Sequence, residues 1–295
     1  MPHRSTKPTS RLAPSPTGAL HLGNACTFLV NWAIARQHGW RLIMRIEDLD
    51  GPRIKPGAVD QTLSILHWLG IDWDGEPIIQ SLALEPYRTA LRQLADRRSV
   101  FACALTRKQI ESAASAPHGD EHELCFTSDL RPADAEAWAF DEESINYRLR
   151  VEPGEVVIED RLRGECRFDV ARTVGDFVVW TKREQPSYQL AVVVDDARRG
   201  VTDVVRGADL LPSAARQKLL YEALDLPEPT WWHTPLIVGT DSRRLAKRHG
   251  DTRLLTYRED GVEPQRIVGL IAFWLGFTPD RQPASPADFL RCFDP

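Results

Sequence analysis

The sequence predicts an α/β fold, an open domain of alternating strands and helices that carries a mixed α+β insertion. Short apolar runs alternate with amphipathic helical stretches between about residues 10 and 74, and this alternation returns after Ser187. Between about residues 100 and 170 it is replaced by Ala-, His- and acid-rich stretches and then by strictly alternating runs. Repeated strand and helix order is typical of a parallel sheet covered by helices, so the middle segment is interpreted as an insertion.

The composition is that of an ordinary soluble protein. The 295 residues are 42% hydrophobic and 27% charged, enough for one large domain or two modest ones. The 37 Lys and Arg residues against 42 Asp and Glu residues give a net charge of −5, so any RNA contact must come from local patches. The apolar runs are shorter than the ~20 residues of a transmembrane helix, and five scattered cysteines with a polar N-terminus favour the cytoplasm. We expect no membrane contact and a monomer, with the oligomeric state left open by the sequence.

The first segment is expected to fold in the order β-α-β-α. Strands are predicted at Arg11–Ser15 and Leu42–Ile46, and helices at Leu22–His38 and Ala58–Leu69, the first of which stops at Gly39. Further strands are expected at Tyr147–Val151, Glu155–Arg161, Leu190–Val194, Val201–Val205 and Trp232–Val238, and further helices at Asp209–Leu224 and Pro264–Leu275.

These elements suggest four parts of the chain. We expect a first half of the catalytic domain in residues 1–99, an insertion in 100–170, a second half in 171–258 and a helical tail in 259–295.

A loop rich in Pro and Gly, PSPTGALHLGN at residues 14–24, lies between the first strand and the first helix. Open α/β sheets bind nucleotides at this position. Gly18 and Gly23 permit close backbone approach, the helix N-terminus offers unpaired N–H groups, and His21 can donate a hydrogen bond to a phosphate. The loop therefore suits a polyphosphate, although a bare His-x-Gly-x would favour an ordinary loop with a satisfied histidine.

The run RLAPSPTG joined to HLGN resembles the signature of glutamyl-type class I aminoacyl-tRNA synthetases, whose ATP-binding motif is called HIGH. The resemblance implies a Rossmann-like catalytic domain and a ligase that uses ATP. Ser15 and Thr17 favour the glutamyl over the glutaminyl branch, and Asn24 replaces the terminal histidine of the motif. The ATP-binding residues that it implies are Pro14, Thr17, Gly18, His21, Gly23 and Asn24, with Lys247 from a later loop.

Two further segments extend the resemblance to the amino-acid site. Arg45–Asp50 follows the second strand, and Glu47 is implied as the partner of the substrate's α-amino group. Ser187–Asp196 and Val204–Asp209 resemble the family's second half-site, which implies contacts from Tyr188 and Arg206. An arginine pairs bidentately with a carboxylate but not with an amide, so Arg206 is the expected selector for glutamate. Arg11 and Ser15 complete the implied glutamate-binding set. Core packing for Tyr188 and a surface ion pair for Arg206 are the alternatives.

The basic run Arg243–Gly250 resembles the second ATP signature, usually written KMSKS. Lys247 holds its key lysine position, whereas Arg244 and Ala246 replace the first lysine and the serine. The implied reaction is an in-line attack of an ionised carboxylate on the α-phosphorus of ATP. Because no general base is needed, His21 and Lys247 are expected to act on the phosphates, together with Mg²⁺.

The chain most resembles the subfamily that attaches glutamate to queuosine in tRNA(Asp). About thirty-five residues follow the second ATP signature's neighbourhood, so no anticodon-binding domain is expected. The expected partners are L-glutamate, ATP and the anticodon stem-loop of tRNA(Asp), whose phosphates would meet Arg198, Arg199, Arg243 and Arg248. A truncated glutamyl-tRNA synthetase that charges a tRNA 3′ end and a non-catalytic nucleotide- or RNA-binding paralogue remain as alternatives.

The subfamily resemblance also implies a zinc site of the form Cys-x-Cys … Tyr-x₃-Cys in the insertion. Cys103 and Cys125 match its outer cysteines, but Leu105 and Glu121 stand at the other two positions. Two of four ligands are too few, so we expect no tightly bound metal unless His118 and His122 complete a mixed site.

Overall fold

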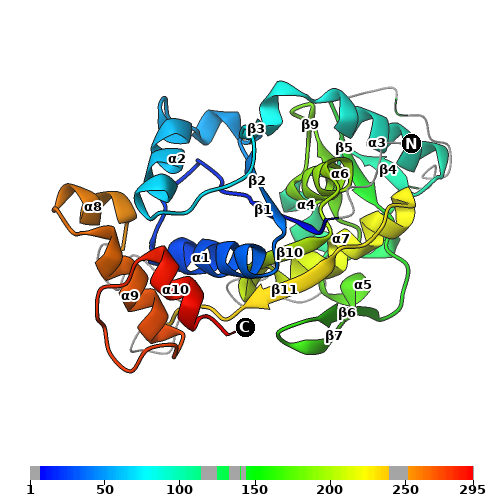
Figure 1. Ribbon diagram of the computed structural model, residues 1–295. Coiled ribbons are helices and arrows are strands. Elements are labelled where there is room, and N and C mark those ends of the chain that lie inside the picture. The colour runs from blue at the N-terminus through cyan, green and yellow to red at the C-terminus, as the bar shows by residue number, and fades with distance from the viewer. Residues whose placement is uncertain (1–6, 114–124, 133–139, 141–143, 239–251, 295) are drawn as a thin grey trace.

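A parallel sheet forms the first part of the molecule, and the predicted α/β class is confirmed. The computed structural model describes residues 7–113, 125–132, 140, 144–238 and 252–294. Strand β1 (Thr9–Leu12) pairs in parallel with β2 (Arg41–Ile46), which pairs in parallel with β3 (Ile78–Ile79). Helix α1 (Leu22–Gln37) connects β1 to β2 (Figure 1), and its apolar side chains share one core with those of both strands.

A second sheet continues from the first. Its order is β10-β11-β6-β7, from strands Asp203–Gly207, Thr230–Thr234, Val156–Asp160 and Gly164–Phe168. Strand β10 lies beside β1, where the N–H of Thr202 donates to the carbonyl of Thr9 at 2.9 Å. The carboxyl ends of β1, β2 and β10 therefore meet at one edge, which is where open α/β sheets bind ligands.

The third sheet is antiparallel and covers one end of the molecule. It has the order β4-β5-β8-β9, from Val100–Cys103, Asn146–Leu149, Val178–Thr181 and Gln185–Pro186. The smaller elements are α2 (Ala58–Trp68), α3 (Glu85–Asp96), α4 (Arg107–Ala113) and α5 (Val170–Thr173), with 3-10 turns at Gly51–Arg53, Gln80–Leu82, Ser128–Leu130 and Ala208–Leu210.

The strand predicted at Leu190–Val194 is wrong, because these residues lie within helix α6 (Tyr188–Arg199). The apolar run is buried on all sides, and a short run of that kind does not distinguish a buried strand from a buried helix. The helix signals lie at its ends. The hydroxyl of Ser187 accepts from the N–H of Leu190 at 3.5 Å, and Gly200 ends the helix at a φ of 68°.

Other strand boundaries also differ from the prediction, and three strands differ by two residues or more at both ends. The strands expected at Arg11–Ser15, Val201–Val205 and Trp232–Val238 are observed at Thr9–Leu12, Asp203–Gly207 and Thr230–Thr234. Proline lacks the N–H group that would extend a strand. The first strand is followed by Pro14 and Pro16, and the last by Pro235.

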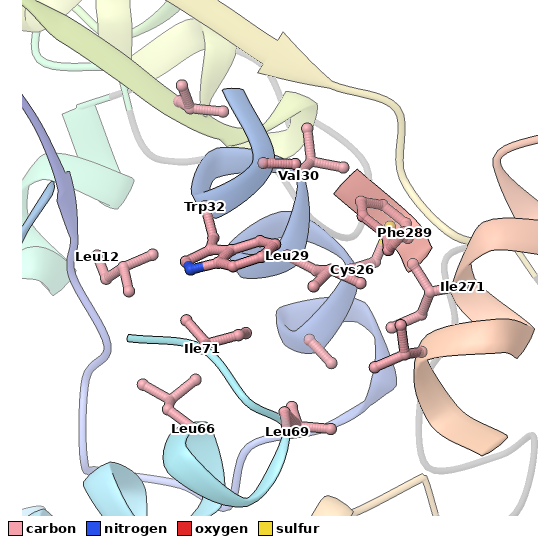
Figure 2. Close-up of a cluster of buried hydrophobic side chains, with 14 of the residues drawn as sticks. Leu12, Cys26, Leu29, Val30, Trp32, Leu66, Leu69, Ile71, Ile271 and Phe289 are labelled. Carbon is pink, nitrogen blue, oxygen red and sulfur yellow. The ribbon is translucent and has the colours of Figure 1, made fainter. Parts of the chain in front are cut away.

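The C-terminal segment packs against α1 as three helices. Helix α7 (Leu211–Leu224) precedes β11, and the chain ends with α8 (Leu254–Glu259), α9 (Pro264–Trp274) and α10 (Pro286–Cys292). The side chain of Phe289 on α10 is fully buried and points toward Cys26 of α1 and Ile271 of α9 (Figure 2). Among the described residues, none of the helices is both long and apolar enough to cross a bilayer.

Close packing of the C-terminal segment on α9 yields a prediction at Gly269. A Cβ atom there would lie 1.9 Å from the carbonyl oxygen of Gln282. Gly269→Ala should therefore lower the free energy of unfolding by ~1–3 kcal/mol, although alanine favours a helix by about 1 kcal/mol over glycine. Urea unfolding measures this change. Gly51→Ala is the control, since a Cβ there meets nothing within 4 Å. Equal stability of both variants would contradict the packing.

Candidate active site

A cavity of about 440 Å³ opens where β1, β2 and β10 end. The residues predicted for ATP and glutamate within the described chain all line it: Arg11, Pro14, Ser15, Thr17, Gly18, His21, Gly23, Asn24, Glu47, Tyr188 and Arg206. They come from the first βα loop, the ends of two strands and the first turn of α6. Lys247 falls in 239–251, outside the described residues, together with Arg243, Arg244, Ala246 and Arg248.

His21 caps helix α1 at the edge of this cavity. Its Nδ1 accepts from the backbone N–H of Asn24 at 3.3 Å, and the amide oxygen of Asn24 accepts from the N–H of His21 at 3.0 Å. A Cβ at position 23 would lie 3.1 Å from the imidazole, so Gly23 gives the ring its room. The capping pair fixes the ring over a helix N-terminus, where the dipole and free N–H groups attract phosphate.

The segment that follows the second ATP signature packs directly against this loop. The N–H of Leu22 donates to the carbonyl of Thr252 at 3.0 Å, and the N–H of Leu254 donates to the carbonyl of Leu20 at 2.9 Å. Residues Pro235, Leu236 and Ile237, which come before 239–251, line the cavity. The described residues on either side of 239–251 therefore lie at this cavity or beside its loop.

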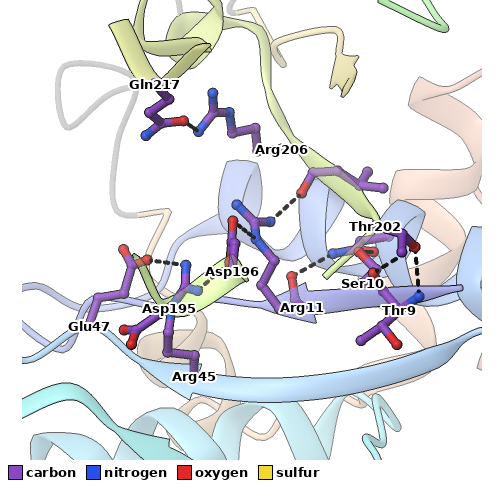
Figure 3. Close-up of polar contacts among 12 residues, drawn as sticks. Thr9, Ser10, Arg11, Arg45, Glu47, Asp195, Asp196, Thr202, Arg206 and Gln217 are labelled. Atoms are coloured by element: carbon purple, nitrogen blue, oxygen red, sulfur yellow. Dashed lines mark hydrogen bonds and ion pairs between the residues drawn. The ribbon is translucent and has the colours of Figure 1, made fainter. Parts of the chain in front are cut away.

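Two buried arginines share one carboxylate behind the cavity (Figure 3). Asp196 of α6 accepts from Nε of Arg11 at 3.3 Å and from Nη1 of Arg45. Arg45 also donates to Glu47 at 2.9 Å. Burial raises the pKa of Asp196, but the arginines outweigh it and hold that pKa below its usual value. Burial likewise raises the pKa of Glu47, where the contribution of Arg45 does not fully offset it.

The neighbouring carboxylate of Asp195 is satisfied by different partners. Its Oδ2 accepts from Nε2 of Gln80 and from the hydroxyl of Tyr87, each at 2.8 Å. Burial, followed by the charge of Asp195, raises the pKa of Tyr87, so the phenol stays a donor. Two adjacent carboxylates on α6 thus anchor the helix in two directions.

Arg206 of β10 is buried with an incomplete set of partners. Its Nε donates to Nε2 of His233 at 3.0 Å, and its Nη1 donates to Oε1 of Gln217 at 2.8 Å. The guanidinium lies over the ring of Trp231 at 5.0 Å, and its buried Nη2 has no hydrogen-bond partner among the residues that the structure describes. Burial and the nearby charge of Arg11 oppose its own charge and lower its pKa. An arginine stays protonated in proteins, so this group lacks an anion.

His233 of β11 is itself held by a buried carboxylate. Its Nδ1 lies 2.6 Å from Oδ2 of Asp160 in β6, so this nitrogen carries the proton and Nε2 accepts from Arg206. Burial, followed by the charge of Arg206, lowers the pKa of His233 to about 4. The ring is therefore neutral at physiological pH.

Tyr188 lies on the first turn of α6, at the mouth of the cavity. Its side chain is 39% exposed, so the alternative of core packing is excluded. A second, open cavity of about 920 Å³ shares Ser15, Thr17, Glu47 and Tyr188 with the first. Arg107, Lys182 and Arg183 lie along its lining. A large anionic ligand can thus approach the amino-acid site from this side.

The predicted phosphate contacts Arg198 and Arg199 lie in the last turn of α6 and line neither cavity. Arg198 instead pairs with Asp195 at 3.7 Å. The structure does not bring these two residues to the mouth of the site.

The two cysteines of the implied zinc site serve other contacts. Cys103 is buried with Phe101, Ile110 and Phe126, with Leu105 packed against this cluster, and the thiol of Cys125 lies 3.4 Å from the carbonyl of Arg172. Among the described residues, no three His, Cys, Asp or Glu side chains gather into a metal site. Because His118, Glu121 and His122 lie outside that part of the chain, the absence of zinc stays a prediction.

Parallel strands that end at a helix N-terminus, with an antiparallel sheet beyond them, fit the catalytic domain of a class I aminoacyl-tRNA synthetase. Residues 8–285 match the family described as "tRNA synthetases class I (E and Q), catalytic domain", so the chain belongs to this ATP-using family. Within it, the chain belongs to the glutamyl-Q tRNA(Asp) synthetases.

Comparison with individual proteins supports this assignment. The chain is 47% identical to a glutamyl-Q tRNA(Asp) synthetase from Rhodopirellula baltica, over 93% of this chain and 87% of that protein. It is 38% identical to glutamate–tRNA ligase 2 of Halorhodospira halophila, over 89% of this chain but 56% of that protein. The crystal structure of a glutamate–tRNA synthetase from Elizabethkingia anophelis superposes with a TM-score of 0.81 at 26% identity, covering 98% of this chain and 66% of that one.

The shared carboxylate gives a stability prediction. Asp196→Asn removes the charge between two buried arginines and should lower the free energy of unfolding by ~3–5 kcal/mol. Denaturant unfolding at pH 6 measures this loss, and Asp225→Asn at an exposed helix end should change little. Because the pKa of Asp196 is lowered in the folded state, the difference should be complete above pH ~4 and shrink as the pH falls through that lowered pKa. A difference independent of pH would contradict it.

Proposed function

We propose that this protein activates L-glutamate with ATP to glutamyl-adenylate and transfers the glutamate to queuosine in the anticodon of tRNA(Asp). The first step is supported mainly by the buried Nη2 of Arg206, which lacks a partner within the described part of the chain and lies in a cavity that Glu47 also lines. A cation that lacks an anion and a carboxylate suit a ligand with a negative side chain and a positive ammonium group. The names of the relatives support the second step.

Glutamate binds between these two groups. Its side-chain carboxylate pairs with Arg206, and its ammonium group with Glu47, which Arg45 holds in place at 2.9 Å. Arg11, Ser15 and Tyr188 complete the pocket from β1, the first loop and α6. The α-carboxylate is then left to face the nucleotide.

ATP lies along the first loop, with its phosphates at the N-terminus of α1. The cavity wall that contacts ATP is formed by Pro14, Thr17, Gly18, His21, Gly23 and Asn24. Lys247 supplies a further cation. Mg²⁺ enters with ATP as part of the substrate. The α-carboxylate attacks the α-phosphorus and pyrophosphate leaves. Since the nucleophile is already ionised, the protein's residues contribute alignment and charge stabilisation, not proton abstraction.

The RNA then approaches through the larger cavity. A hydroxyl of the modified base attacks the carbonyl carbon of the adenylate, an ester forms and AMP leaves. Arg107, Lys182 and Arg183 in that cavity are placed to meet backbone phosphates. Arg243 and Arg248 are further candidates.

Charging of the 3′ end of a tRNA is the second candidate function, because glutamate–tRNA ligases are 38–40% identical to this chain. The third, a non-catalytic paralogue, is favoured by Arg244 and Ala246 in the second ATP signature. Pyrophosphate exchange and tRNA charging separate all three.

We also propose a cytoplasmic monomer, with five unpaired cysteines in support of the compartment. We also propose a catalytic domain (1–99 and 171–258), an insertion (100–170) and a tail (259–295), although the antiparallel sheet extends beyond residue 170 to β8 and β9, and β6 pairs with β11.

Arg206→Ala should abolish glutamate-dependent pyrophosphate exchange while leaving the protein folded. The wild type should prefer glutamate over glutamine strongly, since the loss of a charge-assisted pair is worth ~2–4 kcal/mol. Exchange assays with each amino acid and circular dichroism measure these outcomes. Comparable exchange with both amino acids would refute the glutamate assignment.

The RNA substrate is tested by charging with labelled glutamate. Purified tRNA(Asp) that contains queuosine should accept glutamate, and so should its isolated anticodon stem-loop, whereas tRNA(Asp) without queuosine and tRNA(Glu) should not. If only full-length tRNA(Glu) with an intact 3′ end accepts glutamate, the second candidate function is correct.

A further inference from the structure

The orientation of Arg206 depends on which of its nitrogen atoms the protein has already engaged. A guanidinium has five N–H groups, and a carboxylate can meet it bidentately through Nε and Nη2 or through Nη1 and Nη2. Nε2 of His233 accepts a hydrogen bond from Nε at 3.0 Å, and Oε1 of Gln217 accepts one from Nη1 at 2.8 Å. The side approach is therefore closed, and only the end formed by Nη1 and Nη2 is left for a ligand.

His233 can accept from Arg206 only while it is neutral and protonated on Nδ1. Arginine Nε is a donor with no lone pair to offer, so an N–H on the facing nitrogen of His233 would break the contact. Asp160 prevents this, since its Oδ2 lies 2.6 Å from Nδ1. The charged groups that face the ring are Asp160 from β6, Arg206 from β10 and Arg11 from β1.

Asp160 is itself held rigidly. Its Oδ1 accepts from the backbone N–H groups of Leu162 and Arg163, each at 3.0 Å, and its Oδ2 accepts from the N–H of His233 at 3.0 Å. It lies in β6 directly opposite Trp231 in the parallel pairing with β11. The carboxylate and the imidazole are both completely shielded from solvent.

We propose that Asp160 and His233 are positioning residues for amino-acid recognition. Together they fix the tautomer of the imidazole and, through it, the rotation of the Arg206 guanidinium, so that its Nη1–Nη2 end meets the substrate's side-chain carboxylate. The hairpin of β6 and β7 thereby takes part in selecting glutamate over glutamine. This inference rests on the proposed function, because it assigns the carboxylate to glutamate.

Variants of the pair test the proposal by glutamate-dependent pyrophosphate exchange. His233→Ala should raise KM for glutamate about tenfold or more and lower the preference for glutamate over glutamine, because Nε of Arg206 loses the acceptor that orients the guanidinium. KM for ATP should stay within about twofold, since ATP does not contact this pair. His233→Gln should restore most of the affinity, because its amide oxygen can accept from Nε of Arg206.

Asp160→Asn should also raise KM for glutamate selectively, because an amide facing Nδ1 no longer requires the proton there. The matched controls are His67→Gln, at an exposed histidine whose ring lies 4.2 Å from that of Trp73, and Asp225→Asn. Both controls should leave both KM values and the amino-acid preference unchanged.

Failure of the positioning role and failure of the proposed function give different results in these assays. If the wild type shows no glutamate-dependent exchange, the proposed function fails. If the wild type is active but folded His233→Ala keeps its KM for glutamate, or loses affinity for ATP to the same extent, the positioning role is wrong.

If the His233 variants fail to fold, the proposal is tested by nitrogen NMR of the wild-type protein labelled at its histidine nitrogens. Added glutamate should shift the Nε2 resonance of the histidine that stays neutral at pH 5.5, and an unchanged resonance would overturn the inference.

Discussion

The burial of three guanidinium groups where β1, β2 and β10 end is the constraint on which the site depends. Arg11, Arg45 and Arg206 are each less than 5% exposed, at 3%, 0% and 4%. An arginine cannot shed its charge by losing a proton, so each buried group requires an anion or a full set of acceptors. Arg11 and Arg45 obtain theirs from Asp196, which fixes α6 against the strands by charge as well as by apolar packing.

The same helix carries this constraint further into the molecule. Asp195 turns to the other side and binds Gln80 and Tyr87, which ties α6 to the turn after β3 and to α3. Removing one member of such a network leaves the other buried charges without a partner. By contrast, the C-terminal helices are held mainly by apolar contacts around Phe289, away from the charged cluster.

Much of the fold and part of the site could be predicted from the sequence. Helices α1, α2 and α9 have clear boundaries, and Arg11, His21, Glu47 and Arg206 lie in contiguous motifs. Helix α6 was missed because burial on every side removes its periodicity. Asp160 and His233 are 73 residues apart and carry no local signal, since only the pairing of β6 with β11 brings them together.

The charges around the cavity explain why this arrangement suits glutamate. Arg11 and Arg45 pair directly with Asp196 and Glu47, whereas Arg206 reaches the carboxylate of Asp160 only through His233, and its Nη2 has no partner among the described residues. In the proposed binding mode, the side chain of glutamate gives Nη2 a charged acceptor, whereas the amide of glutamine would leave the buried guanidinium without that charge-assisted pair. A protonated His233 would add a fourth cation and turn an N–H toward Arg206. Burial lowers the pKa of His233 to about 4, so the ring stays neutral at neutral pH and its Nε2 remains able to accept from Arg206.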